Sequence, residues 1–524
     1  MQLAYFLIVI AYVLIMLGVG YWCMRRTKTV GDFFLGGRTL GPWMSAFAYG
    51  TTYFSAVLFI GYAGKLGWGF GIHTMWIVIG NTLVGTFLAW ALLAGRTRTM
   101  TERLNAITMP EFLRARYDSK TLQVISALVI FIFLVPYSAS VLMGMSYLFE
   151  MTLHIPYNYA LFFLTGLTAL YLVMGGYFAV AVSDFIRGIV EFGGVMLMVY
   201  LLASKVGGFA HATHQLLIQP DAAPGLLPKA TKVLGTGPLH VTVPGWLTLA
   251  ALVLITSFGP WALPQMVQKF YSIRSKADVT RAMTIAGVFA IFMAFGAYYS
   301  GALTHLFFGS KLPDVLMGPK GPIWDKIMPQ FITHAGLPEV LVLIIVLMVF
   351  SASMSSLSSL VLVSSSAISV DVYGAFVNRH ANQKQTMTLL RILCVLFVGA
   401  SLWIAMSKPT FIVNLMVIAW GTLAGVFMAP YVYGLFWKRT TRAGVFAGII
   451  VGLTSAIVLF SSWGENGVPL AGAITMFLPM IVVPIVSLLT PPPPVELINQ
   501  AFTDTVSETQ ADAETESAKE GALV

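Results

Sequence analysis

The chain has little charge and almost no cysteine. Only 10% of its 524 residues are Asp, Glu, Lys or Arg, whereas a soluble protein carries about 25%. This excludes a water-soluble globular fold. The two cysteines, Cys23 and Cys394, lie in apolar runs, and the eight histidines form no ligand pair on one predicted helix face. We therefore expect neither a disulfide framework nor a structural metal site.

Hydrophobic residues make up 58% of the chain, and its mean hydropathy is +0.83. Apolar runs of about 20 residues cross a bilayer as helices. The sequence thus predicts an all-α polytopic membrane protein embedded in the lipid bilayer. Its thirteen predicted transmembrane helices are 3–23, 42–63, 71–95, 123–149, 157–175, 178–203, 244–265, 281–307, 337–370, 387–406, 410–436, 443–462 and 471–490.

Basic residues are placed unevenly between the predicted helices. Twenty of the 30 lysines and arginines fall in alternate connections, from Arg25 in the first to Arg442 in the last. Because basic loops stay on the cytoplasmic side, this predicts an outer N-terminus and a cytoplasmic C-terminus. The net charge of +9 then reports topology, and no nucleic-acid partner is expected.

The chain divides into four predicted parts. Residues 1–40 hold the first helix and its loop, 41–440 a core of ten helices, and 441–490 the last two helices. Residues 491–524 begin with four prolines and continue polar and acidic, a composition that predicts a disordered cytoplasmic tail. No soluble domain is recognisable, so neither enzyme activity nor an attached signalling domain is expected.

A serine cluster stands in the ninth predicted helix. Ten serines lie between Ser351 and Ser369, in a segment without acidic or basic residues from Val340 to Val370. Buried hydroxyls cost free energy unless they are paired. Helical rotation puts Ala352, Ser355, Ser356 and Ser359 on one face, with Ser358 beside Ser355. Such oxygens suit a desolvated Na⁺, although close helix packing with serines bonded to their own backbone is the alternative.

Two predicted helices carry helix-weakening residues at membrane depth. The second contains Gly50-Thr51-Thr52-Tyr53-Phe54-Ser55, and the seventh contains Gly259-Pro260-Trp261. Irregular backbone is tolerated there only where it lines a protein cavity. If helices 2–6 and 7–11 form inverted five-helix repeats, the two breaks occupy equivalent positions and indicate a central transport site. The alternative is a pair of kinks without function.

Three charged residues lie inside the sixth predicted helix. Asp184, Arg187 and Glu191 are spaced three and four residues apart, so they share one face and can pair. Intramembrane charges generally face a wet cavity and mark ion pathways. The alternative places Asp184 near the inner interface and makes Arg187 and Glu191 a structural pair.

Three motifs carry a resemblance to a known family. They are Phe34-Leu-Gly-Gly-Arg-Thr-Leu-Gly-Pro42, Gly175-Gly-Tyr-Phe-Ala-Val-Ala-Val-Ser-Asp184, and Ala352-Ser-Met-Ser-Ser356 leading to Ala367-Ile-Ser-Val-Asp-Val-Tyr373. With them the chain resembles the sodium/solute symporter family, including bacterial sodium/proline and sodium/pantothenate symporters. The resemblance implies the inverted-repeat fold of the leucine transporter and Na⁺-driven uptake across the bacterial cytoplasmic membrane, without a cofactor other than the coupling ion.

The resemblance also implies ion sites. The first sodium site would use the carbonyls of Thr51, Phe54 and Ala352 with the hydroxyls of Ser355 and Ser356. A second sodium, held by some members, would lie among Asp184, Ser355, Ser358 and Ser359.

Substrate residues are expected at the breaks and on the fourth helix: Tyr53, Tyr137, Thr256, Pro260 and Trp261. Tyr137 matches a substrate-site tyrosine of the proline carriers, but those carriers have an aspartate where Tyr53 stands. The expected substrate is therefore a small organic carboxylate: an amino acid, pantothenate or another monocarboxylate. Two alternatives stay open, proton coupling through Asp184 or Glu191 and a solute sensor built on the transporter fold. The sequence gives no indication of oligomeric state.

Overall fold

The structure is a computed structural model that describes residues 2–24, 38–219, 223–227, 230–234, 241–309, 311–319, 321–378 and 382–502. Side chains 2–7, 9, 22–24, 172–178 and 383 are outside this description. Residues 34–37 of the first family motif lie outside the described residues. So do the side chains of residues 175–178, at the start of the second motif.

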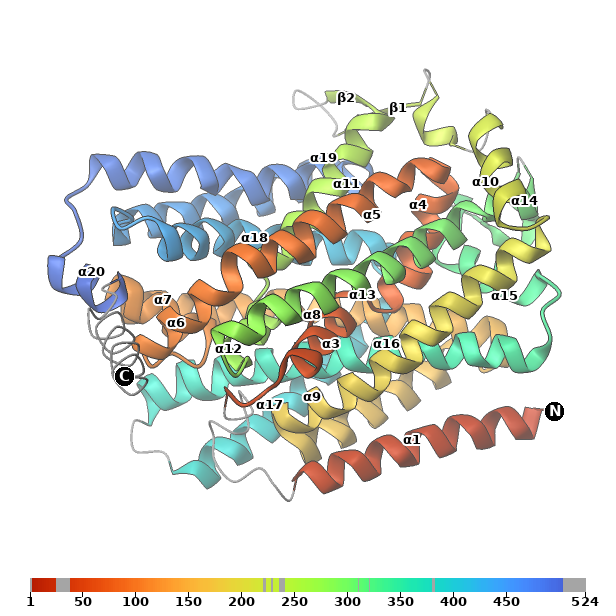
Figure 1. The fold of residues 1–524 in the computed structure, drawn as a ribbon. Coiled ribbons are helices and arrows are strands. Elements are labelled where there is room, and N and C mark those ends of the chain that lie inside the picture. The colour runs from red at the N-terminus through yellow and green to blue at the C-terminus, as the bar shows by residue number, and fades with distance from the viewer. Residues whose placement is uncertain are drawn as a thin grey trace, which may run out of the picture.

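The described chain is almost entirely helical (Figure 1). Its main helices are α1 (Gln2–Met24), α3 (Pro42–Tyr53), η2 (Val57–Tyr62), α4 (Ala63–Phe70), η3 (Gly71–Thr74), α5 (Met75–Ile79), η4 (Gly80–Ala94), α6 (Gly95–Arg103), α7 (Met109–Tyr117), α8 (Lys120–Leu153), α9 (Tyr157–Lys205), α10 (Phe209–Ile218), α11 (Gly245–Phe258), η8 (Gly259–Trp261), α12 (Pro264–Ser272), α13 (Lys276–Ala302), α14 (Thr304–Phe308), α15 (Ile327–His334), α16 (Glu339–Ser366), η11 (Ala367–Val377), α17 (Gln383–Ser407), α18 (Ile412–Phe436), α19 (Arg442–Leu489) and α20 (Val495–Phe502). Two short antiparallel pairs, β1 (Thr231–Leu234) with β2 (Val241–Pro244) and β3 (Met317–Gly318) with β4 (Gly321–Pro322), lie in the loops.

Nine helices within the described residues are long and apolar enough to cross a membrane. Some hold two predicted spans. The Tyr171 hydroxyl lies 2.5 Å from Ser183 Oγ, although twelve residues of straight helix would separate them by about 18 Å. The chain of α9 therefore turns back between Tyr171 and Ala179. In α19, Gly464 has a φ of 61° and marks the kink between two helices. The exact count of thirteen stays a prediction.

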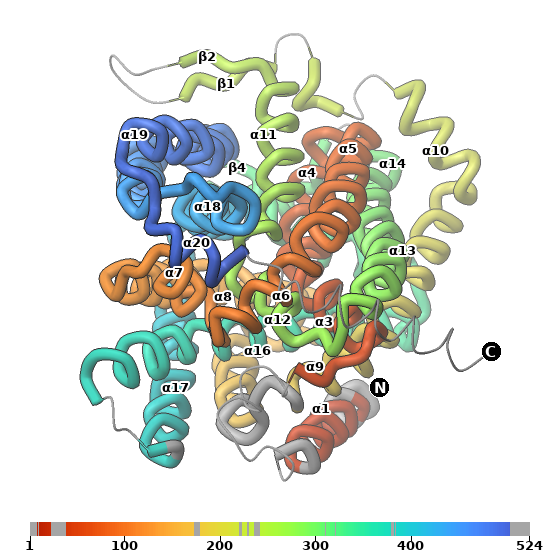
Figure 2. The backbone as a smooth tube through the Cα atoms, turned by 60° about the vertical axis from the view of Figure 1, so that its left-hand side comes forward, coloured from red at the N-terminus to blue at the C-terminus, as the bar shows by residue number. Residues whose placement is uncertain are grey.

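The helices form one bundle in which the two interrupted helices and α16 are central. In Figure 2, α3, α12 and α16 lie in the middle, with α1, α17 and α19 at the edge. Helix α16 packs on α8, α9 and α3, while α18 packs on α8 and α19. Helix α1 packs on α9, and its Tyr12 hydroxyl is 2.5 Å from Ser351 Oγ of α16.

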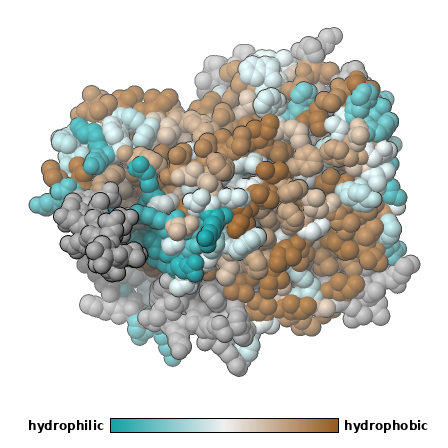
Figure 3. Space-filling model, in the orientation of Figure 1, coloured by the Kyte–Doolittle hydropathy of each residue, from teal (hydrophilic) through white to brown (hydrophobic). Residues whose placement is uncertain are grey.

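The outer surface is apolar around the middle of the bundle. Figure 3 shows hydrophobic side chains across one face between hydrophilic patches at the two ends. Leu14, Trp403 and Ile457, on three different helices, are each more than 60% exposed. Apolar surface of this extent marks an interaction with membrane or partner, and the length of the helices matches a bilayer.

The predicted basic connections meet at one end of the bundle. Arg98 donates hydrogen bonds to the carbonyls of Ile273 and Arg274, which lie between α12 and α13. Arg38 donates to the carbonyl of Ala106 at 2.9 Å. Arg442 donates to the carbonyl of Asp118 at 3.4 Å, so the basic connections that hold Arg38, Arg98, Arg274 and Arg442 share one physical face.

The tail differs from its prediction. Residues 495–502 form helix α20, which packs on α6 and α7, so the prediction of disorder was wrong for this segment. The Phe502 ring lies 4.9 Å from the Arg116 guanidinium, and this contact anchors a short amphipathic helix that composition alone did not reveal. Residues 503–524 lie outside the described residues.

Candidate functional site

The two predicted breaks are present and lie in the middle of the bundle. Helix α3 ends at Tyr53, where Phe54 is extended with φ −104° and ψ 103°, and the chain becomes helical again at Val57. Helix α11 gives way to the short η8 at Gly259 and restarts at Pro264 as α12. The carbonyls of Thr51 and Thr52, in the last turn of α3, accept from a side chain of another helix and not from the backbone of α3.

Gly259 permits a close approach at the second break. A Cβ added there would lie 2.6 Å from a ring carbon of Trp420 on α18. Only glycine lets the Trp420 indole lie against the backbone of η8. The break thus positions an aromatic side chain from a distant helix.

The residues predicted for the first sodium site come together from α3 and α16. Ser356 Oγ donates to the carbonyls of Thr51, at 3.2 Å, and Thr52, at 3.1 Å. Ser355 Oγ lies 2.7 Å from Thr51 Oγ1. Phe54 stands at the break, and Ala352 lies one helical turn before Ser356, both fully buried. The carbonyls of Phe54 and Ala352, the other two predicted ligands, therefore lie at the end of α3 and in α16.

Carbonyl and hydroxyl oxygens are the ligand type that a hard cation binds. A cation of the size of Ca²⁺, which Na⁺ closely matches, binds oxygens at about 2.3–2.6 Å, so neighbouring ligands stand roughly 3.2–3.7 Å apart. The oxygens here are joined by hydrogen bonds of 2.7, 3.1 and 3.2 Å, so the shorter contacts would lengthen around a bound ion. When the ion binds, the hydroxyl can turn its lone pair to the ion and release the carbonyl to become a ligand as well.

The residues predicted for the second sodium site form a different arrangement. Ser355 Oγ lies 2.7 Å from Asp184 Oδ1, and Ser359 Oγ lies 3.0 Å from Thr52 Oγ1. Ser358 instead donates to the Met354 carbonyl of its own helix at 2.6 Å. Three of the four predicted residues thus belong to one buried network, and Ser358 contacts its own backbone.

A lysine that the sequence interpretation placed elsewhere completes this network. With the seventh helix predicted as 244–265, Lys269 would lie in the basic connection that follows it. Helix α12 continues to Ser272, and Lys269 is fully buried with Nζ 3.0 Å from Ser359 Oγ and 3.9 Å from Asp184 Oδ2. The assignment of Lys269 to a loop was wrong. The amphipathic sequence after Pro264 was the signal that the helix continues.

Arg187 and Glu191 do not pair as their spacing suggested. Arg187 Nη1 lies 3.6 Å from Asp184 Oδ1, and its guanidinium lies 4.9 Å from the Tyr171 ring. Neither carboxylate oxygen of the fully buried Glu191 has a hydrogen-bond partner among the described residues. Arg187 therefore interacts with the ion network through Asp184.

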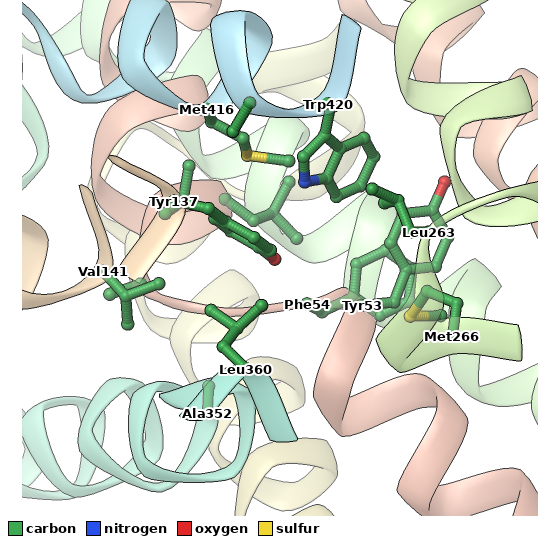
Figure 4. Close-up of a cluster of buried hydrophobic side chains, with 14 of the residues drawn as sticks. Tyr53, Phe54, Tyr137, Val141, Leu263, Met266, Ala352, Leu360, Met416 and Trp420 are labelled. Atoms are coloured by element: carbon green, nitrogen blue, oxygen red, sulfur yellow. The ribbon is translucent and has the colours of Figure 1, made fainter. Parts of the chain in front are cut away.

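Aromatic side chains meet beside the two breaks, as Figure 4 shows for Tyr53, Tyr137 and Trp420. The Trp420 ring is 5.9 Å from that of Tyr53 and 5.8 Å from that of Tyr137. Neither the Tyr137 hydroxyl nor Trp420 Nε1 makes a hydrogen bond of normal geometry within the described residues. Both are buried donors that a polar ligand group can satisfy.

The other predicted substrate residues divide between this cluster and its edge. The carbonyl of Thr256 accepts a 2.5 Å hydrogen bond from the Tyr53 hydroxyl, and Pro260 lies in the η8 break. Trp261 contacts a different helix: its Nε1 donates to the carbonyl of Val84 in η4 at 2.9 Å. The sequence analysis missed Trp420, since nothing in its local sequence breaks the helical pattern.

A cavity of about 420 Å³ lies toward the end of the bundle that carries the β1–β2 hairpin. Its lining includes Lys65, Lys232, Asn414 and the aromatic rings of Phe70 and Phe411. Lys65 Nζ donates to Asn414 Oδ1 at 3.3 Å and lies 4.7 Å from the centre of the Phe411 ring. The lining also holds Glu465, so the two lysines leave it one formal positive charge, which suits a small anion with an apolar body.

Comparison with known proteins agrees with this geometry. The profile of the sodium:solute symporter family matches residues 33–452. The chain belongs to the sodium:solute symporter family. It is 30% identical over 462 residues to the high-affinity proline transporter PutP of Bacillus subtilis, covering 86% of this chain and 90% of that protein. It is 29% identical to the sodium/proline symporter of Escherichia coli, covering 87% of each chain.

Solved structures show the same fold. A Na⁺-coupled sialic acid symporter, in a substrate-bound outward-open state, matches with a TM-score of 0.75 at 20% identity, covering 93% of this chain and 98% of that one. Mhp1, a nucleobase-cation-symport-1 family transporter in a closed conformation, matches with a TM-score of 0.51 at 13% identity, covering 90% of this chain and 97% of that one. The predicted all-α inverted-repeat fold is confirmed.

This symporter is a multi-pass membrane protein that couples Na⁺ to the movement of a small organic solute, as its family membership shows. Na⁺ is the coupling ion. The family consists of transporters and not of enzymes.

Proposed function

We propose that this symporter imports a small organic carboxylate with an apolar body, and that Na⁺ binds where α3 meets α16. The observation that carries the proposal is the break at Phe54, which ends α3 between two clusters. Thr51 contacts Ser355 and Ser356 on one side, and Tyr53 contacts Thr256 and lies beside Trp420 on the other. One short segment therefore joins the oxygen cluster to the aromatic cluster.

The shared segment explains coupling. Binding of Na⁺ by carbonyls at the end of α3 and hydroxyls of α16 holds the break in one conformation. That conformation sets the positions of Tyr53 and, through it, of the α11 end at Thr256. A solute that fits between Tyr53, Tyr137 and Trp420 then binds a site that the ion has already organised, so each ligand strengthens the binding of the other.

Charge and shape support a carboxylate. Tyr137 and Trp420 offer hydrogen-bond donors and aromatic surface, and the cavity with Lys65 and Lys232 provides positive charge on the expected entry side. Two relatives are named as proline transporters or symporters, and a structural neighbour as a sialic acid symporter; both of these solutes carry a carboxylate. Proline, other amino acids, pantothenate and short monocarboxylates are the proposed candidates.

The proposed orientation follows the basic end of the bundle. With the end around Arg38, Arg98 and Arg442 in the cytoplasm, the N-terminus faces outward and the β1–β2 hairpin covers the outer side. The protein would then lie in the bacterial cytoplasmic membrane and move solute inward with the Na⁺ gradient.

The test is uptake of radiolabelled carboxylates into vesicles that contain the purified protein, with an inward Na⁺ gradient at equal pH on both sides. We expect accumulation of one or more carboxylates that stops when K⁺ replaces Na⁺. Accumulation driven by a proton gradient in Na⁺-free buffer would instead support the proton-coupled alternative. Uptake of uncharged solutes only would contradict the carboxylate proposal.

A further inference from the structure

Lys269 places a cation of the chain itself inside the ion network. Its Nζ lies 3.0 Å from Ser359 Oγ and 3.9 Å from Asp184 Oδ2, and both side chains are fully buried or nearly so. Ser359 and Asp184 are two of the residues expected to hold a second sodium. The ammonium thus lies where a second coupling ion would bind.

The carboxylate of Asp184 already faces two cations of the chain itself. Asp184 faces Lys269 through Oδ2 and Arg187 through Oδ1, and Ser355 Oγ is 2.7 Å from the same Oδ1. A sodium ion bound to both Asp184 and Ser359 would stand within a few ångströms of the ammonium nitrogen. Two like charges that close repel strongly in a buried site, where the effective dielectric constant is low.

We propose that the Lys269 ammonium replaces the second sodium ion, so that this symporter binds and couples one Na⁺ per solute. The remaining sodium binds at Thr51, Ser355 and Ser356, and the inference rests on that proposed site. Lys269 acts as a positioning residue: it compensates Asp184 and orients Ser359 without contact with the transported ion.

The position of Lys269 also connects the two repeats. Helix α12 is the second half of the interrupted seventh helix, and its lysine reaches Ser359 of α16, which in turn lies 3.0 Å from Thr52 Oγ1 of α3. Thr52 is the neighbour of Thr51, whose carbonyl accepts from Ser356. The ammonium is therefore two hydrogen bonds away from the proposed sodium ligands, close enough for its removal to change ion binding.

The variant that tests this is Lys269→Met, which keeps an apolar stem of similar length and removes the charge. Lys269→Arg retains the charge and serves as the conservative rescue. Lys276→Met is the matched control, because Lys276 is exposed at the start of α13. Folding of each variant is checked by size-exclusion elution and a cooperative thermal transition before binding is measured.

The experiment is equilibrium binding of ²²Na⁺ to the purified protein, together with the Na⁺ dependence of its melting temperature. We expect one bound Na⁺ and a Hill coefficient close to one for the wild type, Lys269→Arg and Lys276→Met. Lys269→Met should bind two ions with a Hill coefficient approaching two, and adding Asp184→Asn should return it to one.

The wild-type stoichiometry tests the proposal even if Lys269→Met fails to fold. Two ions bound to the wild type would overturn it and leave the proposed function intact. A folded Lys269→Met that binds only one ion would also overturn the proposal. The ammonium would then not be what keeps a second sodium ion out. No saturable Na⁺ binding at all would instead contradict the proposed sodium site itself, and this inference with it.

Discussion

Replacing Ser356 by alanine tests the proposed sodium site where the structure is most specific. Ser356 Oγ is fully buried and contacts the carbonyls of Thr51 and Thr52 at 3.2 and 3.1 Å. The variant removes one of the proposed ligands and leaves no group in its place. Water cannot easily substitute, because close-packed side chains surround the position.

The expected loss of sodium affinity is that of one interaction with a charged group, about 1.5–3 kcal/mol. Taking about 2 kcal/mol, and 1.4 kcal/mol per factor of ten, the Na⁺ concentration for half-maximal effect should rise by about 30-fold. The variant should also melt earlier without sodium, since two carbonyls at the end of α3 lose their donor at a cost of about 1–3 kcal/mol.

The assay is therefore the Na⁺-induced shift in melting temperature, measured for each variant against its own sodium-free value. Ser364→Ala and Ser366→Ala are the controls on the same helix. Ser364 Oγ has no hydrogen-bond partner among the described residues, and Ser366 Oγ donates to the Val363 carbonyl of its own helix. Equal and mild effects for Ser355→Ala, Ser356→Ala and both controls would refute the sodium site and favour close packing as the role of the serines.

Three further predictions concern the network and the aromatic cluster. Asp184→Asn leaves Lys269 buried without its carboxylate and should lower stability by about 3–5 kcal/mol, which Lys269→Met in the same chain should largely restore; an unchanged denaturation midpoint would contradict the ion pair. Tyr137→Ala should weaken solute binding by tenfold or more while the sodium-induced thermal shift persists without solute, and loss of that shift would place Tyr137 in the ion site instead. Gly259→Ala should push the Trp420 ring away from η8, cost about 1–3 kcal/mol of stability and reduce the solute-induced thermal shift, whereas Gly287→Ala, whose Cβ meets nothing within 4 Å, should have no effect on either.

Several elements of the fold could be predicted because they depend on local chemistry. The Gly50–Ser55 and Gly259–Trp261 segments weaken a helix wherever they stand, and the structure interrupts both helices there. The serine face of α16 follows from helical rotation alone, and Ser355, Ser356 and Ser359 all point to α3 or its neighbours.

Other features depend on contacts between distant segments and could not be predicted. Lys269 carries the same charge in a loop as in a bundle, and only the continuation of α12 and the facing Asp184 show that it is buried. Trp420 belongs to an unbroken apolar helix, and its position depends on the absence of a side chain at Gly259, on a helix far away in the sequence. Helix α20 packs on α6 and α7. The sequence of the tail does not show that this surface is present for it to pack on.

The entry of ²²Na⁺ into vesicles, with and without the solute that the uptake screen identifies, tests the central claim most directly. For the wild type, solute on the outside should accelerate ²²Na⁺ entry. Ser356→Ala should need about 30-fold more Na⁺ for the same acceleration, in line with about 2 kcal/mol of lost binding, whereas Ser364→Ala should behave as the wild type does. Solute entry without any ²²Na⁺, or the same Na⁺ dependence in all three proteins, would contradict coupling through the contact between α3 and α16.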